Sequence, residues 1–319
     1  MNPPPKPTNG PPPAPRPLRD DDRPALATLF EASEWRAEAE SVREGRDGLR
    51  QPDDLQIRWG VEGDGLVGTA RLLREAGEFS ARLLVRPDAR EKGVGRALWN
   101  TLLAEAHTQG ATKLSASVRD DDPASLAFAT RRGFAQIGHL FESVLDLETF
   151  DPRAFPTPEG VRVFSMADVS DDETNRRKLW RLNDWDIDAG RGACRDFERF
   201  QRDIFEGYWY RPEGQIVAAM GEAWVGLAAV GMTGEGKGYN MMTGVVPAFR
   251  GRGIATALKL ATVEFARRAG AREIWTNNDS ENAPMLAINR RLGYRPVPGW
   301  LRLEAPLNPT EPRPAPPRP

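Results

Sequence analysis

The chain has 319 residues, enough for two domains of ordinary size. Its 44 basic residues nearly balance its 46 acidic residues, which gives no electrostatic case for binding nucleic acid or an anionic membrane surface. A single cysteine, Cys194, excludes an internal disulfide framework and a thiolate metal cluster, and with only two histidines a multi-histidine site is impossible within one chain, so we expect no metal.

Both ends of the chain are rich in proline, which removes backbone donors and favours an extended chain. We therefore expect disordered tails at residues 1–17 and 306–319, with a docking motif for a proline-reading partner as the alternative. No apolar run approaches the roughly 20 residues that span a bilayer. The first residues also lack the apolar core of a secretory signal, so we expect a soluble, cytoplasmic protein.

Between the tails the sequence contains an internal repeat. Val85–Phe134 aligns with Val245–Tyr294 at a single shift of 160 residues and without a gap. A period this long indicates two copies of one domain rather than a solenoid. Phe-Pro, Thr-Pro and Gly punctuate residues 146–160, as expected of a linker. We predict domains at residues 18–148 and 161–305, joined by a linker at 149–160.

Each copy is predicted to mix helices and strands, and the second copy is the clearer one. Its pattern predicts helices near 173–182 and 196–205, strands at 215–219, 224–232 and 239–246, a helix at 256–269, a strand at 273–276 and a helix at 284–292. The helix at 256–269 is amphipathic, with Ala257, then Leu260 or Ala261, then Phe265 on successive turns. Asn282 is placed to cap the last helix, and Gly293 to end it in a left-handed conformation.

In both copies a strand ending in Val-x-Pro leads into a glycine turn and then a helix. Such a turn directs several backbone N–H groups and the positive end of a helix dipole at one point, which suits phosphate oxygens. A Walker loop would need Gly-Lys-Ser/Thr, which neither copy has. A dinucleotide fingerprint would need a third glycine where Thr256 stands.

The spacing Arg/Gln-x-x-Gly-x-Gly/Ala resembles the acyl-CoA signature of the GNAT family of N-acetyltransferases. It occurs as Arg250–Ala255 and again as Arg90–Gly95. The segment Asn282–Tyr294 resembles the helix that borders the thiol end of the cofactor in this family, and Asp122–Phe134 is a looser match. The resemblance implies an α/β fold of two tandem GNAT-type acyltransferase domains, each a twisted mixed sheet flanked by helices, with acetyl-CoA as co-substrate.

The resemblance also implies where acetyl-CoA binds. Its pyrophosphate would lie on the amides of the signature turn, with the arginines of that turn adding charge-assisted bonds, and its pantetheine arm would pair with the freed edge of the preceding strand. The backbone N–H near Val246 would stabilise the oxyanion. The residues expected to bind the cofactor are Val245, Val246, Arg250, Gly251, Arg252, Gly253, Ile254, Ala255 and Asn282 in the second copy, and Val85, Arg90, Lys92, Gly93, Val94 and Gly95 in the first.

Catalytic groups are fewer than the resemblance would suggest. Many family members place a tyrosine four residues before the closing glycine, but here that position holds Asn289 in the second copy and Ala129 in the first. Asn289 can still donate a hydrogen bond to the departing thiolate, so it is the expected catalytic residue, in the copy with the fuller motifs. The strand Tyr239–Val246 contains no carboxylate or histidine to act as a general base. Glu78, in the first copy, is a candidate base or a solvated strand end.

The acceptor site is expected near Asn183–Gly190, where three aspartates at alternating positions would attract a cationic amine, or form a solvated loop. Tyr208, Trp209 and Tyr210 are candidates for a pocket wall or for the core, and Cys194 is expected to be a free structural thiol.

We expect an enzyme that moves an acetyl group directly from acetyl-CoA to a primary amine of a small molecule. The alternatives are a protein N-acetyltransferase and a non-catalytic regulatory module that binds acyl-CoA. The sequence favours neither nucleic acid nor membrane as a partner, and no particular oligomeric state.

Overall fold

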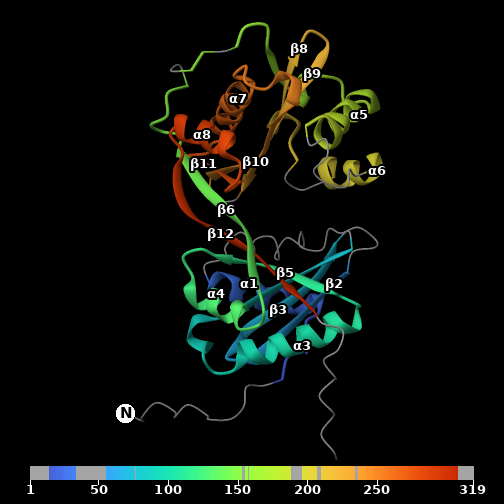
Figure 1. Cartoon of the computed structure of the whole chain (residues 1–319), viewed down its shortest axis with the longest axis vertical. Coiled ribbons are helices and arrows are strands. Elements are labelled where there is room, and N and C mark those ends of the chain that lie inside the picture. The colour runs from blue at the N-terminus through green and yellow to red at the C-terminus, as the bar shows by residue number, and fades with distance from the viewer. Residues whose placement is uncertain are drawn as a thin grey trace, which may run out of the picture. The chain divides into compact units, whose positions relative to one another are not determined.

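The computed structural model describes residues 14–33, 55–75, 77–152, 155–156, 158–187, 196–206, 210–233 and 236–307. These residues form two compact units (Figure 1). The first unit comprises the chain up to Ile137 together with the chain from Leu301 onward, and the second comprises Gly138–Trp300.

The first unit is a sheet with helices on both faces. Its strands follow the order β1 (Arg16–Pro17), β2 (Leu55–Gly63), β3 (Gly65–Glu75), β4 (Glu78–Val85), β5 (Lys113–Arg119) and β12 (Arg295–Pro306). Helix α3 (Val94–Thr108) buries Leu98 and Leu102 on one face, and α1 (Arg23–Glu31) packs against Leu66 and Leu84 on the other. Helix α4 (Pro123–Thr130) follows β5.

The second unit repeats this arrangement. Its strands follow the order β6 (Ala135–Asp146), β11 (Glu273–Asp279), β10 (Lys237–Val245), β9 (Ala223–Thr233), β8 (Gln215–Met220) and β7 (Arg162–Ser165). Helices α7 (Ile254–Arg268) and α8 (Ala283–Arg291) lie on one side of the sheet. On the other side lie α5 (Glu173–Arg181) with the π-helical η6 (Leu182–Ile187), and α6 (Phe197–Phe200) with the π-helical η7 (Gln201–Phe205) (Figure 1).

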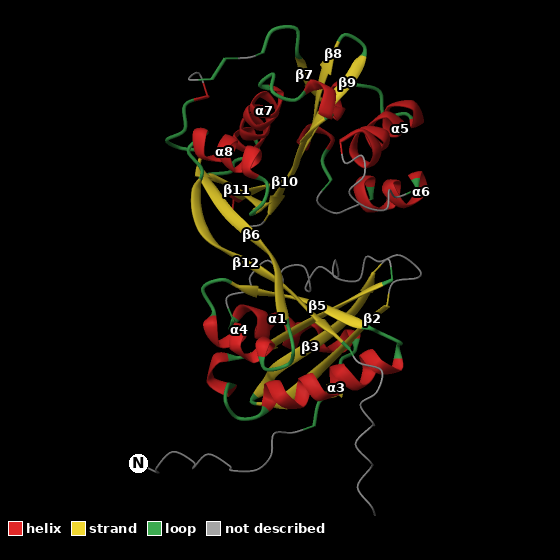
Figure 2. Cartoon of the chain, in the orientation of Figure 1, coloured by secondary structure: helices red, strands yellow, loops and turns green. Residues whose placement is uncertain are grey.

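The last strand of each repeat belongs to the unit built by the other repeat. Strand β6, from the first repeat, pairs antiparallel with β11 through Leu140–Asp146, and its Leu145 joins a core with Ile274. Strand β12, from the second repeat, places Leu301, Leu303 and Ala305 in the core of the first unit, because alternate residues of a strand face the same side. Figure 2 shows both as long continuous strands. We call this arrangement the strand exchange.

The observed units therefore divide differently from the domains expected at residues 18–148 and 161–305. The repeat alignment shows which residues are alike, but it carries no information on which sheet a terminal strand joins. Other elements follow the predicted order closely, and the fold is the expected pair of mixed sheets flanked by helices. The predicted strand at 273–276 extends to Asp279, and the predicted helix at 196–205 is divided into α6 and η7.

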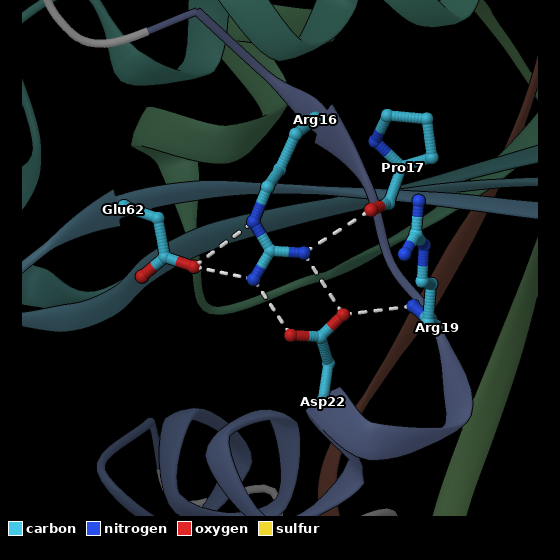
Figure 3. Close-up of polar contacts among 5 residues, drawn as sticks. All are labelled: Arg16, Pro17, Arg19, Asp22 and Glu62. Carbon is cyan, nitrogen blue, oxygen red and sulfur yellow. Dashed lines mark hydrogen bonds and ion pairs between the residues drawn. The ribbon is translucent and has the colours of Figure 1, made fainter.

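Residues 14–17 and 306–307, which were expected to belong to the tails, are part of the described structure. Residues 1–13 and 308–319 lie outside the described residues, but Arg16 and Pro17 form β1 against β2. Figure 3 shows why this segment is ordered: the Arg16 guanidinium donates to both carboxylate oxygens of Asp22, at 2.9 and 2.6 Å, and also to Glu62 on β2. At the other end, Leu307 is buried and its N–H donates to the carbonyl of Thr112 at 2.7 Å.

Candidate active site

In the second unit, β10 and β11 form a fork. The two parallel strands pair only from Lys237–Asn240 to Glu273–Thr276. A bulge follows between Asn240 and Met242, after which β10 continues to Val245 paired with β9 alone among the described strands. The edge of β10 that faces away from β9 is therefore open from the bulge to the signature turn. An open strand edge offers backbone donors and acceptors to an extended ligand.

The signature turn begins where this open edge ends. Gly251 and Gly253 have φ values of 77° and 80°, in the left-handed region that favours glycine. Helix α7 starts at Ile254, and the amide of Ala257 donates to the carbonyl of Gly253. The amides between these glycines and Ala257 belong to the first helical turn, where N–H groups have no intrahelical acceptor. They lie at the positive end of the helix dipole, an arrangement that suits an anion.

The signature arginine braces this turn. Nε of Arg250 donates to the carbonyl of Val245 at 2.9 Å, and a terminal nitrogen donates to the carbonyl of Ile187 at 3.2 Å. In the first copy, Nε of Arg90 makes the equivalent bond to Val85 at 3.3 Å. The guanidinium of Arg250 is thus directed at backbone oxygens, and the donors of the turn are its amides.

The amide that faces the fork is that of Val245. The N–H of Val246 donates to the carbonyl of Val225 on β9 at 2.9 Å, so it is directed away from the open edge. Backbone groups of successive strand residues alternate in direction, so the N–H and C=O of Val245 face the fork. The hydrogen bond from Arg250 to the carbonyl of Val245 agrees with this orientation of the Val245 backbone. The N–H of Val246, near which the oxyanion donor was expected, is thus bonded within the sheet, and the N–H directed at the fork is that of Val245.

Helix α8 borders the β11 arm of the fork on the side of α7. Asn282 caps it as expected, its Oδ1 accepting from the amide of Met285 at 3.3 Å. Asn289 is 2% exposed, and its Nδ2 donates to Oδ1 of Asn278, near the end of β11, at 2.6 Å. Its own Oδ1 accepts no hydrogen bond from the part of the chain that the structure describes. Asn289 is thus fixed beside the fork.

A buried lysine lies beneath the bulge. Lys259 of α7 is 1% exposed, and its Nζ donates to Oδ1 of Asn240 at 2.8 Å and lies 4.9 Å from the ring centroid of Tyr294. Burial lowers the pKa of Lys259 to about 7. In the first copy, Trp99 stands in place of Lys259 and Phe134 in place of Tyr294, and the two rings form an edge-to-face aromatic pair. Sequence reasoning missed this lysine, although the repeat alignment pairs it with the aromatic Trp99, which indicates a core position.

The first copy has the same turn but different surroundings. Gly93 has a φ of 85° and starts α3, yet a methyl group at Gly95 would lie 3.2 Å from the ring of Phe128 and 3.6 Å from Val85. The Phe128 ring therefore lies against the last glycine of the first signature turn. Glu78, the candidate base, stands at the opposite end of β4, where it is exposed and ion-paired with Lys113 at 3.2 Å.

The expected acceptor segment is only partly described. Asp184 is 9% exposed and accepts a hydrogen bond from Asn183 at 2.5 Å, so its carboxylate is not on a solvated loop. Tyr210 packs on Phe205 with ring centroids 5.0 Å apart, and burial raises its pKa to about 12. The remaining candidates lie outside the described residues: Asp188, Cys194, Tyr208, Trp209 and the side chain of Asp186.

The described residues form neither a metal centre nor a membrane-spanning helix. They contain no group of three or more histidine, cysteine, aspartate or glutamate side chains that could hold a metal ion. Their helices include none that combines the length and apolar character needed to cross a membrane.

Comparison with known proteins agrees with the repeat. The model of the acetyltransferase (GNAT) family matches the chain twice, at residues 19–134 and at residues 179–294. Both matches contain a signature turn and the helix that follows β5 or β11.

Relatives cover most of the chain. A mycothiol acetyltransferase of Actinosynnema mirum is 28% identical over 81% of this chain and 89% of its own length. One of Geodermatophilus obscurus is 26% identical over 83% of this chain and 84% of its own. Among solved structures, a tandem GNAT protein from the clavulanic acid biosynthesis pathway aligns with a TM-score of 0.74 at 24% identity, covering 92% of this chain and 98% of that one. A GCN5-related N-acetyltransferase from Sphaerobacter thermophilus gives 0.73 at 20% identity, covering 92% and 95%.

Proposed function

Because this chain belongs to the acetyltransferase (GNAT) family, we propose that it transfers an acetyl group from acetyl-CoA to the primary amine of a small molecule, and that the second unit performs the transfer. Both units have a fork, since the described pairing of β4 with β5 is confined to Ser80 and Ser115, and the observation that carries the assignment to the second unit is Asn289 beside its fork, where the first repeat has Ala129. At the fork of the second unit an open strand edge runs directly into a turn of unpaired amides at the start of α7. The relatives named mycothiol acetyltransferase support a small-molecule acceptor.

The chain's own groups fit acetyl-CoA. Amides from Gly251 to Ala255 would hold the pyrophosphate, and Gly253 lets the backbone approach it because it has no Cβ. The open edge of β10 would pair with the pantetheine arm, and the N–H of Val245 would stabilise charge on the carbonyl oxygen. The chemistry that acetyl-CoA supplies is a thioester whose acetyl carbon is transferred to the amine.

Asn289 fits the leaving-group side of the site. Its Nδ2 is held beside the fork by Asn278, at a position where a hydrogen-bond donor would stabilise the departing thiolate. An amide cannot supply a proton at neutral pH, so we propose that the thiolate departs as an anion that is stabilised by hydrogen bonding.

We further propose that the first unit binds acetyl-CoA weakly and serves mainly as a structural partner. The ring of Phe128 lies against Gly95 at the start of α3, where the second repeat has the smaller Ile288. The expected binding residues from Val85 to Gly95 would then hold the donor less tightly than those from Val245 to Ala255.

Release of free thiol from acetyl-CoA tests the function with a panel of primary amines that includes the acceptor of the mycothiol acetyltransferases. We expect acceptor-dependent thiol release. Acetyl-CoA binding without thiol release for any amine would support a non-catalytic binding module instead, and acetylation of peptides alone would support a protein N-acetyltransferase.

Two matched variants test the assignment to the second unit. Arg250→Ala and Arg90→Ala each remove the guanidinium that braces one signature turn. We expect Arg250→Ala to weaken acetyl-CoA binding and reduce turnover roughly tenfold or more, since it removes two charge-assisted hydrogen bonds. Arg90→Ala should leave turnover within about twofold of the unmodified protein. The reverse result would assign catalysis to the first unit.

A further inference from the structure

Three polar side chains from three adjacent strands meet at the base of the fork. Asn277 of β11 lies opposite Glu142 of β6, and Nδ2 of Asn277 donates to the phenol oxygen of Tyr239 on β10 at 2.7 Å. Residues directly opposite each other in an antiparallel pair project to the same face, with Cβ atoms about 4.5–5.5 Å apart. We call Glu142, Asn277 and Tyr239 the polar trio. All three side chains are half-buried.

The polar trio lies on the face of the sheet opposite to Asn289. On β10, Asn240 faces α7, where it binds Lys259, and so Tyr239 before it faces the other side. That side carries η6, where Ile187 packs against the position of Gly244. Asn278, which holds Asn289, likewise alternates with Asn277 along β11. Two sets of polar groups thus approach the fork from opposite faces.

The polar trio exists in the second unit only. At the shift of 160 residues, Tyr239, Asn277 and Glu142 correspond to Phe79, Ser117 and Arg302. That set contains neither a carboxylate nor a phenol. The second repeat has no carboxylate on β10, and the carboxylate of the polar trio comes from the first repeat through the strand exchange.

We propose that Glu142 is the general base of the transfer, binding the acceptor's ammonium group and taking its proton. This inference rests on the proposed function. A first proton moves from the ammonium nitrogen to a carboxylate oxygen of Glu142 and on to solvent, which frees the nitrogen lone pair. That lone pair forms a C–N bond to the acetyl carbon, the C–S bond breaks with its electrons leaving on sulfur, and the nitrogen of the adduct gives up a second proton to Glu142. Glu142 then returns the proton to solvent.

Tyr239 acts as a positioning residue for Glu142. Burial, with a further contribution from the charge of Glu142, raises the pKa of Tyr239 to about 12, so the phenol stays protonated. Because its oxygen accepts from Asn277, its hydroxyl proton is available to a neighbouring carboxylate. Four other charged side chains of β6, β10 and β11 share this face by strand alternation: Asp146, Lys237, Glu273 and Asp279.

The test is the pH dependence of kcat/KM for an amine substrate, measured for the unmodified chain, Glu142→Gln, Glu142→Asp and the control Asp279→Asn. Asp279 is the adjacent carboxylate on the same face, and its Oδ1 accepts from the amide of Glu281 at 2.9 Å. Glu142→Gln keeps size and hydrogen bonding but cannot take a proton, so we expect a loss of at least about 100-fold and loss of the acidic limb of the profile. Glu142→Asp should recover part of the activity, and Asp279→Asn should stay within about threefold.

Two further measurements do not depend on turnover. Calorimetric binding of the amine in the presence of CoA should weaken about tenfold in Glu142→Gln, while CoA binding stays unchanged. NMR of the chain labelled at tyrosine Cζ should show a lower pKa for Tyr239 in that variant, because a negative neighbour has been removed.

The possible outcomes separate the two proposals. If the unmodified chain releases thiol with an amine but Glu142→Gln is as active, or Asp279→Asn is the variant that loses the acidic limb, Glu142 is not the base and the proposed function stands. If the unmodified chain releases no thiol with any amine, the proposed function fails and the role of Glu142 fails with it. An unchanged Tyr239 pKa would contradict the arrangement of the polar trio itself.

Discussion

Asn289 is the residue whose role depends most directly on a single hydrogen bond. Replacing it with alanine removes the donor beside the fork and leaves Asn278 without its partner. We expect Asn289→Ala to lower kcat about tenfold with little change in KM for acetyl-CoA, since one hydrogen bond to a charged group is worth roughly 1.5–3 kcal/mol. Arg290→Ala, an exposed neighbour on the same helix, is the control for kcat and KM. An equal loss in both variants would point to a general disturbance of α8.

Lys259 is expected to limit the stability of the protein. Its pKa falls from 10.5 to about 7 on folding, so the native state binds fewer protons than the unfolded chain between those values and the free energy of unfolding rises as the pH increases from about 7 toward 10.5. Below pH 7 the full cost of the buried charge remains. Lys259→Met should therefore stabilise the protein by roughly 1–4 kcal/mol at pH 6, and the gain should vanish near pH 10.5.

Denaturant unfolding of both proteins at pH 6, 8 and 10 measures this difference, with the exposed Lys92→Met as control. A difference between Lys259→Met and the unmodified chain that does not change with pH would contradict the assigned cause.

At the level of elements, the sequence predicted the turns well and the helix faces less well. Gly93 and Gly253 are local signals, since a left-handed φ favours glycine, although Glu91, the equivalent of Gly251, adopts a φ of 63° without one. The buried face of α7 was predicted only in part: Ala257 and Phe265 are buried as expected, but Leu260 and Ala261 are half-buried. The fully buried side chains of this helix include Leu258 and Lys259. Apolar periodicity cannot identify a helix face that includes a buried charge.

The N-terminal segment is the element whose order depends on one ionic network. Arg16 holds the pKa of Asp22 down to about 2, so the contribution of this pair to the free energy of unfolding is present above about pH 4 and is lost as the pH falls toward 2. Because the Arg16 side chain is 43% exposed, we expect Arg16→Gln to cost only about 0.2–1 kcal/mol at pH 7.

At pH 2 the Arg16→Gln variant and the unmodified chain should differ little. Hydrogen exchange at the amides of Arg16 to Arg19 should report the loosening at pH 7 most directly. Exchange at neutral pH that is unchanged by the substitution would show that β1 is held by its pairing with β2 alone.

At the scale of the whole molecule, the strand exchange was invisible to the sequence. A repeat alignment identified two copies and the order of their elements, because those depend on local pattern. Which sheet β6 and β12 join depends on tertiary pairing, and the boundaries at 148 and 161 were therefore placed as if each copy closed its own sheet. Glu142 was missed for the same reason, since the search for a base was confined to the strand of its own repeat.

The strand exchange predicts that neither repeat folds alone. A fragment of residues 1–152 lacks Leu301, Leu303 and Ala305 of its core, and a fragment of residues 153–319 lacks Leu145. Burial of each missing side chain would contribute about 1–3 kcal/mol to the free energy of unfolding. Together these contributions are a large share of the stability of an ordinary domain. We expect each fragment to show little cooperative unfolding by circular dichroism, and the two together to recover it. A fragment of residues 1–152 with a cooperative transition of its own would contradict this expectation.

The strand exchange also determines when the sheet of the first unit can be completed during synthesis. When Ile137 has left the ribosome, the edge of β5 still lacks the neighbour that Leu301 onward will provide, so the growing chain carries an uncovered strand edge while the whole second repeat is translated. At about 5–20 residues per second, that interval lasts on the order of ten to thirty seconds. Nascent chains paused before residue 301 should accordingly bind chaperones through the first repeat and release them once the final strand emerges.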